Sequence, residues 1–202
     1  MTMKHYVLDT MKFRLVILVF IALGITANDA FGQPKQEREF SIQKKVLPIT
    51  VIQFVDKLPK TIKRLRFYKE IDGNKESYEV KFKYQKQHFS CEFSIEGVLE
   101  DIEVIEKQKY LSESIKTYFK SNFKKAKLLK IQKQYVNDSK VNPNSFLSSI
   151  ISSSNTLTIN YEIIAEVTEN SKRYLREFTF SSNGEFIGFR NVAPSSYGHV
   201  LY

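Results

Sequence analysis

The sequence predicts an α+β protein of two tandem units, each a helix followed by a roughly four-stranded antiparallel sheet. Three observations lead to this fold class. Residues 47–55 align with residues 111–119 without a gap, basic and then alternating apolar runs follow both segments, and both series end in a glycine turn with a final strand. A chain of 202 residues is long enough for two such small units packed together.

The two helices are predicted by apolar residues at positions i, i+4, i+7 and i+8, which form one face of an amphipathic helix. These residues are Leu47, Val51, Phe54 and Val55 in the first segment, and Leu111, Ile115, Tyr118 and Phe119 in the second. Pro48 suits the first turn of a helix, where a missing N–H has no partner to lose. We therefore expect one short helix at the start of each unit.

The strands are predicted by apolar residues that recur at every second position and by turn residues between the runs. The paired runs are 62–68 with 126–132, 78–84 with 161–167, and the hairpins 92–97 and 177–184 with the final strands 98–105 and 185–191. Gly97 and Gly184 stand where a hairpin turn needs a positive φ. Cys91 lies in an alternating apolar run, so we expect a buried side chain, and a single cysteine excludes an internal disulfide.

The second unit carries an insert, roughly residues 137–155, which is rich in Ser and Asn and contains Pro143. The first unit makes the same connection with the short turn 72–74. The centre of the insert, residues 146–151, is apolar for a loop in solvent. Three interpretations remain open: the insert packs on the sheet, stays irregular, or contacts a partner.

The N-terminus has the layout of a secretory signal peptide. Lys12 and Arg14 precede the apolar run 15–25, and smaller residues follow as far as Gly32. The run has eleven residues, whereas a bilayer span needs about 20. We predict cleavage after Gly32, with Ala27 as the second choice and Met11 as an alternative start, and therefore a periplasmic or secreted protein without a transmembrane segment.

The resulting domain organisation has five parts. Residues 1–32 are the signal peptide, 33–45 an N-terminal linker, 46–107 the first unit, 108–193 the second unit with its insert 137–155, and 194–202 a C-terminal tail. Loss of residues 1–32 removes three basic and two acidic residues from a chain of formal charge +9, which leaves +8. A positive protein favours encounters with acidic proteins or anionic polymers.

Several short motifs resemble a known family. Leu47-Pro48 opens a helix, residues 78–80 read Tyr-Glu-Val, and Phe93 and Gly97 form a Phe-x-x-x-Gly hairpin that leads into an acidic strand. Together they resemble the PepSY-like repeats related to the β-lactamase inhibitor protein, which are frequent in exported proteins of Bacteroidetes-type bacteria. The resemblance covers residues 46–192 and implies two side-by-side units with a concave sheet surface open to contact, and a binding or inhibitory role. The chain departs from the family at the hairpin turns 96–97 and 183–184, in its insert, and in lacking matching inhibitory-loop residues.

The sequence offers no constellation for catalysis or metal binding. After residue 32 the only histidines are His88 and His199, and we expect His88 to face solvent and His199 to lie in the tail. These two residues and Cys91 do not have metal-ligand spacing, and no glycine-rich phosphate loop occurs. We therefore expect no enzyme, no metal and no cofactor.

Two kinds of charged run are interpreted as solvated strand edges. The acidic run consists of Glu100, Asp101, Glu103 and Glu106, and the basic runs of Lys60, Lys63, Arg64, Arg66 and Lys69, and of Lys124, Lys125, Lys127, Lys130 and Lys133. Basic residues interleaved with aromatic ones can also bind nucleic acid or acidic glycans. The export signal argues against nucleic acid.

These observations favour an exported, non-catalytic binding protein, protein-binding or inhibitor-like, with a periplasmic or envelope protein as partner. The alternative is a protein that binds an anionic polymer or envelope surface through its basic strands, which a steep loss of affinity with salt would reveal. A purely structural envelope role is the third class. The candidate contact residues are Arg66, Tyr68, Phe146, Leu147 and Ile150. Neither the partner nor the oligomeric state follows from the sequence.

Overall fold

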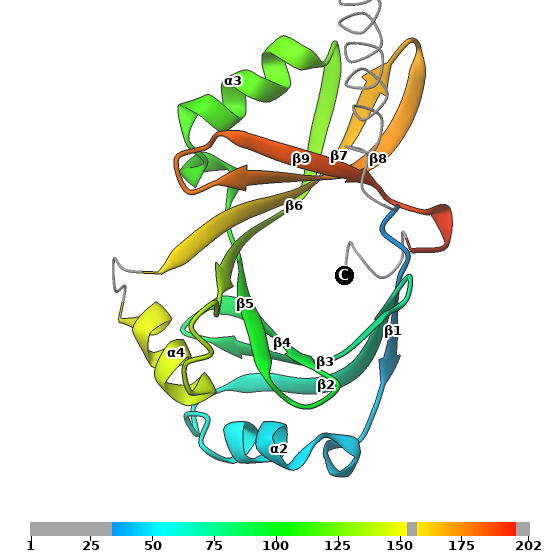
Figure 1. The fold of residues 1–202 in the computed structure, drawn as a ribbon. Coiled ribbons are helices and arrows are strands. Elements are labelled where there is room, and N and C mark those ends of the chain that lie inside the picture. The colour runs from blue at the N-terminus through cyan, green and yellow to red at the C-terminus, as the bar shows by residue number, and fades with distance from the viewer. Residues whose placement is uncertain (1–33, 153–156, 197–202) are drawn as a thin grey trace, which may run out of the picture. The chain divides into compact units, whose positions relative to one another are not determined.

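The computed structural model describes residues 34–152 and 157–196, which form a single nine-stranded antiparallel sheet in chain order (Figure 1). The strands are β1 (Glu37–Ser41), β2 (Lys63–Asp72), β3 (Lys75–Tyr84), β4 (Gln87–Ser94), β5 (Leu99–Ile105), β6 (Lys125–Val136), β7 (Thr158–Glu169), β8 (Lys172–Ser181) and β9 (Phe186–Asn191). The helices of this part of the chain are α2 (Ile49–Asp56), α3 (Glu113–Asn122) and α4 (Pro143–Ile151). Short 3₁₀ turns cover Lys44–Val46, Gln108–Tyr110 and Pro194–Ser196.

The prediction of two tandem units, each with its own four-stranded sheet, is wrong. Strands β5 and β6 pair antiparallel from Asp101 opposite Val136 to Ile105 opposite Gln132, so the sheet runs on without a break. The ninth strand, β1, lies in the segment predicted as a linker and pairs with β2. The physical reason is that β5 and β6 would otherwise each present an open edge of unpaired N–H and C=O groups, and their pairing removes both edges.

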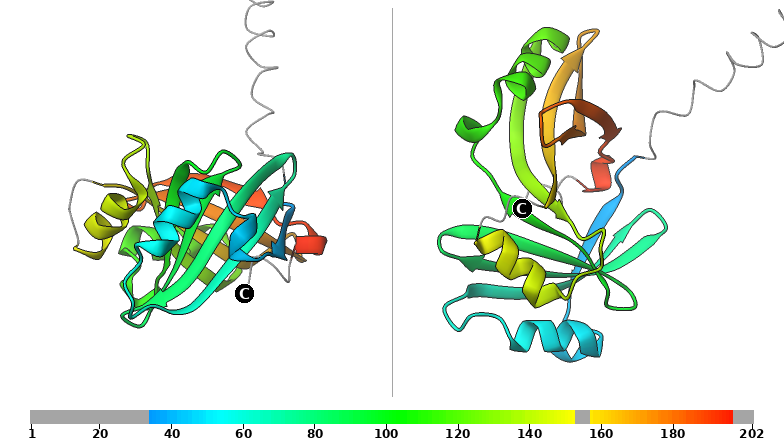
Figure 2. Two further views of the ribbon diagram at one scale, coloured as in Figure 1. Left: turned by 90° about the horizontal axis from the view of Figure 1, so that it is seen from below. Right: turned by 60° about the vertical axis from the view of Figure 1, so that its left-hand side comes forward.

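The first and last strands of the sheet also meet at one point. The Lys35 N–H donates to the Asn191 carbonyl at 2.8 Å, and the Ala193 N–H donates to the Lys35 carbonyl at 2.9 Å. These bonds form a parallel bridge between Lys35 and Val192. The sheet is strongly curved, and α2 and α3 lie on its outer side (Figures 1 and 2). The inner side is the concave face.

Two apolar cores lie between the outer face and the helices. Under α2, Phe54 packs on Phe93 with ring centroids 5.3 Å apart. Under α3, Phe119 packs on Phe178 with ring centroids 5.0 Å apart. Cys91 is fully buried in the first core, as the sequence predicts. Successive residues along each strand thus alternate between the outer face beneath a helix and the concave face.

The insert forms α4 and belongs to the first core. The Asn142 side chain caps the helix by accepting from the Asn144 and Ser145 N–H groups, and Pro143 occupies the first turn. Phe146, Leu147 and Ile150 are only 4%, 3% and 8% exposed. Local packing is therefore the right interpretation for residues 143–151, and these three candidate contact residues have no surface to offer a partner. The predicted signal peptide, residues 153–156 of the insert, and His199 with the rest of 197–202 lie outside the described residues.

A single glycine joins α2 to the hairpin between β4 and β5. Gly97 has φ +78°, and an added Cβ would meet Thr50 Oγ1 at 2.1 Å and Pro48 Cβ at 2.9 Å. The Thr50 hydroxyl donates to the Gly97 carbonyl at 2.9 Å. The first turn of α2 thus packs directly against the backbone of the hairpin turn.

We expect Gly97→Ala to lower the free energy of unfolding by about 2 kcal/mol or more, since the left-handed φ and a clash with the Thr50 and Pro48 side chains both disfavour the new methyl group. Urea unfolding followed by circular dichroism measures the change. Gly188→Ala is the matched control, because an added Cβ there meets nothing within 4 Å. Equal losses in both variants would contradict the assignment of this contact.

Candidate functional site

The concave face of the sheet is lined with charged and polar side chains. These are the residues that alternate along the strands with the apolar residues of the outer face. Directly opposed pairs on neighbouring strands include Glu39 with Glu70, Glu79 with Glu92, and Ser90 with Glu103. A polar band therefore crosses the sheet from β1 to β5. Among described residues, Glu37, Glu79, Asp101 and Glu177 are at most 7% exposed.

The interpretation of the acidic run as a solvated edge is wrong for Asp101 and Glu103. Strand β5 lies between β4 and β6 and is not an edge. Asp101 is 7% exposed, and Glu103 accepts a hydrogen bond from the Gln132 side chain of β6. The basic strands β2 and β6 are likewise interior strands of the sheet, so their lysines and arginines do not guard an edge.

One ion-pair network joins the two ends of the sheet. Lys35 Nζ lies 2.8 Å from Glu37 and 2.6 Å from Glu177. Arg190 lies 2.6 Å from Glu177 and 2.8 Å from Asp72. Burial opposes the charge of Glu177, but Lys35 and Arg190 outweigh it and lower the pKa of this carboxyl. The network therefore holds β1, β2, β8 and β9 together with its charges compensated.

A second group surrounds Lys81 on β3. Its Nζ lies 2.6 Å from Glu39 and 3.1 Å from Glu79, and the Ser90 hydroxyl donates to Glu79. Burial raises the pKa of Glu79 to about 7, against the effect of Lys81. Burial opposes the charge of Lys81 as well, yet Glu79 and Glu39 raise its pKa. The Glu79 carboxyl is thus partly protonated near neutral pH.

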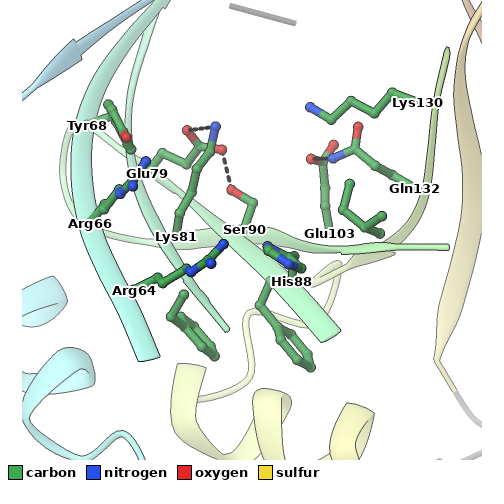
Figure 3. A pocket seen from close by; sticks show the side chains of 13 residues that line it. Arg64, Arg66, Tyr68, Glu79, Lys81, His88, Ser90, Glu103, Lys130 and Gln132 are labelled. Atoms are coloured by element: carbon green, nitrogen blue, oxygen red, sulfur yellow. Dashed lines mark hydrogen bonds and ion pairs between the residues drawn. The ribbon is translucent and has the colours of Figure 1, made fainter. Parts of the chain in front are cut away.

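A cavity of about 230 Å³ opens beside this group (Figure 3). Arg64, Arg66 and Tyr68 of β2 line one side, and Lys130 and Gln132 of β6 line the other (Figure 3). The strands between them complete the wall with five polar residues, Glu79, Lys81, His88, Ser90 and Glu103, and with three apolar ones, Phe82, Phe89 and Ile105. We call this cavity the basic pocket.

Two β-bulges place cations at the basic pocket. In β2 the register shifts between Lys63 and Arg66, and Arg64 takes the left-handed φ of 57°. In β6 the register shifts between Leu128 and Lys130, so Leu128 packs against the core under α3 while Lys130 lines the pocket. Bulges commonly re-aim side chains at functional sites, and strained φ values concentrate there.

The pocket is electrostatically positive at the end formed by β2. The pKa of His88 is lowered, first by partial burial and then by Lys83 and Arg64. Within residues 34–152 and 157–196, no carboxylate lies within ion-pair distance of Arg64, Arg66 or Lys130. Lys130 acts on Glu103 from beyond ion-pair distance, and Arg64 and Arg66 are the cations most open to an anionic group.

The structure brings together only part of the predicted contact set. Arg66 and Tyr68 line the basic pocket, whereas Phe146, Leu147 and Ile150 are buried in the core on the other face. Sequence reasoning missed Glu79, Lys81, Ser90 and Gln132 as pocket residues. The only signal was their alternation with buried apolar residues, which also fits a solvated strand face. His88 is exposed, as expected.

The raised pKa of Glu79 predicts a dependence of stability on pH. The folded protein retains this proton up to about pH 7, whereas the unfolded chain loses it near the ordinary value of 4.5. The stabilising contribution is therefore complete below that ordinary value and is lost as the pH rises through about 7. Asp101 and Glu162, whose pKa values burial also raises, act in the same direction.

We expect the free energy of unfolding to fall by about 2 kcal/mol or more between about pH 5 and 8, and Glu79→Gln to make this slope shallower. Urea unfolding at a series of pH values measures it. Glu185→Gln, which changes an exposed carboxylate, should leave the slope unchanged. A slope that is the same in all three proteins would rule out a buried, titrating Glu79.

Comparisons with known proteins assign the chain to no family. No family model matches it, and no curated protein matches it. Among the described residues, no helix is long and apolar enough to cross a membrane.

Two solved structures are similar to it. One is described as a periplasmic protein of the DUF2874 family from Bacteroides vulgatus; it is 22% identical, with 82% of this chain and 99% of that chain covered and a TM-score of 0.29. The other is described as a calcium-regulated periplasmic protein from Bacteroides thetaiotaomicron; it is 23% identical, with 76% and 97% covered and a TM-score of 0.29. The finer resemblance to PepSY-like repeats and to the β-lactamase inhibitor protein is not confirmed.

Proposed function

We propose that the chain is an exported, non-catalytic binding protein whose basic pocket receives an anionic group of a polypeptide partner. The observation that carries this proposal is the convergence of Arg64, Arg66 and Lys130 on one cavity without a carboxylate partner among the described residues. The other concave cations, such as Lys35 and Lys81, already form ion pairs. The signal peptide supports a partner in the periplasm or envelope.

The size and chemistry of the pocket favour a carboxylate. The volume of about 230 Å³ is small for a drug-sized molecule, for which pockets of about 300–1,000 Å³ are usual, but it accommodates a single acidic group. A guanidinium offers a planar fork that binds carboxylate oxygens bidentately. Tyr68 and Phe89 add apolar contact beside the charges. An acidic side chain or a C-terminal carboxylate of a partner protein combines these features.

A catalytic role is not favoured by the arrangement of the pocket. Ser90 and His88 lie on the same strand, but the Ser90 hydroxyl donates to Glu79. In a Ser–His hydrolase the hydroxyl would instead donate to the imidazole. We therefore assign the pocket to binding.

An anionic polymer remains the second candidate, because another open groove is basic. Lys124, Lys125 and Lys127 of the β6 end line it together with Arg173 of β8. Arg173 lies 3.7 Å from Glu166, and the lysines have no ion pair among the described residues. Binding here would be distributed over many surface charges and would weaken steeply with salt.

We expect fluorescently labelled peptides that end in Asp or Glu with a free carboxylate to bind, and Arg64→Gln/Arg66→Gln to weaken that binding about tenfold or more, which is about 1.4 kcal/mol. Fluorescence anisotropy measures the affinity. Amidated, uncharged analogues of the same peptides should bind as weakly to wild type as the acidic peptides do to the variant.

Lys124→Gln/Lys125→Gln is the matched control, because it removes the same amount of charge outside the basic pocket. Unchanged affinity in this control supports the pocket. Equal losses in both double variants would instead indicate general charge attraction and favour the anionic polymer.

A further inference from the structure

A smaller cavity of about 40 Å³ adjoins the basic pocket on the concave face, and carboxyl groups dominate its wall. It is lined by Glu37, Glu70, Glu79, Glu92, Asp101 and Glu103. Lys35 and Lys130 are the cationic residues of the wall. With every group ionised, the carboxylates would outnumber the ammonium groups three to one. We call this space the acidic cavity.

Two carboxyls of the cavity wall, Glu37 and Glu70, form a cluster with Glu39, which lies beside the cavity and pairs with Lys81. One oxygen each of Glu37, Glu39 and Glu70 lies within 4.8 Å of the others. Glu39 and Glu70 are direct cross-strand partners, and Glu37 is two residues along β1 on the same face. Like charges that face each other across a ladder are destabilising, so the sequence places them here against the ordinary preference of a sheet.

A second, independent observation concerns Asp101 on the wall of the same cavity. Asp101 is 7% exposed, and its Oδ1 has no hydrogen-bond partner among the described residues. Its other oxygen accepts from the Gln134 side chain at 3.2 Å. A buried carboxyl oxygen without a hydrogen-bond partner loses the free energy of its hydration. No group of the described residues satisfies this atom, so a bound ligand would stabilise it.

Glu70 shows how strongly the cavity disfavours negative charge. Burial, and after it the charges of Glu37, Glu79 and Glu92, raise the pKa of Glu70 to about 10. No ion pair or hydrogen bond to the Glu70 carboxyl exists within the described ranges. Clustered buried carboxyls can be neutralised by protons or by a bound cation.

We propose that the acidic cavity binds one divalent cation of the calcium class, with carboxylate oxygens of Glu37, Glu39 and Glu70 as ligands and Asp101 facing the same space. The wall supplies oxygen atoms and no thiolate or imidazole, which selects a hard cation over zinc or copper. A volume of about 40 Å³ holds an ion but few waters. Mg²⁺ usually keeps several waters, whereas Ca²⁺ takes most of its six to eight ligands from protein oxygens.

Cation binding in the acidic cavity should also depend on pH. A carboxyl group must be ionised to hold a cation, so protons and the cation compete for the same oxygen atoms. Binding therefore releases protons and tightens as the pH rises. The charged groups that face the cation are the other carboxyls of the wall together with Lys35 and Lys130, whose positive charges oppose it.

The test is isothermal titration of the chelator-treated exported protein with CaCl₂ alone, in two buffers that differ in ionisation enthalpy. We expect one saturable site, a buffer-dependent heat that reports proton release, and a rise in the melting temperature. Glu70→Gln and Asp101→Asn should each weaken binding about tenfold or more, since each replaces a carboxyl group that can ionise on a bound cation with a neutral amide of the same size. Glu185→Gln, an exposed neutralisation, should bind as wild type does.

Three results would overturn the proposal. The first is the absence of heat and of a melting shift up to about 10 mM Ca²⁺, well above the affinity range of extracellular calcium modules. The second is binding that survives unchanged in both Glu70→Gln and Asp101→Asn, which would place the ion elsewhere. The third is an equal affinity for Mg²⁺. Arg64→Gln/Arg66→Gln should retain cation binding, so this outcome is separate from that of the peptide experiment.

Discussion

The structure depends on the requirement that charged groups on a curved sheet be compensated where they face one another. The outer face is filled by apolar residues beneath α2, α3 and α4, so strand alternation sends charged residues such as Glu79, Lys81 and Glu177 to the concave face. There, residues from β1 to β9 approach one another and lose much of their hydration. Each carboxylate must then find a cation, a hydrogen-bond donor or a proton.

At the ends of the sheet, every charge of the network has a partner of opposite charge. Lys35, Glu177 and Arg190 lie at the corner where the first and last strands meet, and each charge has a partner within 2.8 Å. Backbone hydrogen bonds between Lys35 and residues 191 and 193 run through the same place. Removing one member of such a network leaves another charge buried and unpaired, which is more harmful than the loss of the pair itself. Charge compensation and strand pairing thus support each other here.

Much of the local structure could be predicted from the sequence, but the joining of the sheet could not. Periodicity located α2 and α3, strands β2 to β9 and the buried Cys91, but not β1. It could not show that β5 pairs with β6, because a period of two specifies which face a residue takes and not which strand lies beside it. The same limit hid the site: Glu79 and Asp101 alternate with core residues, and that pattern is identical for a solvated face and for a buried concave one.

The basic pocket and the acidic cavity are not independent, because they share wall residues. Glu79, Ser90, Glu103, Lys130 and Gln132 line both. A positive charge placed in the acidic cavity would raise the potential at the pocket and draw the carboxyls between them toward the cation. Both effects would make the potential at Arg64 and Arg66 more favourable to an anion. Linkage then requires that an anion in the pocket tighten the cation in turn. The alternation that crowds charge onto one face thereby also places the basic pocket and the acidic cavity side by side.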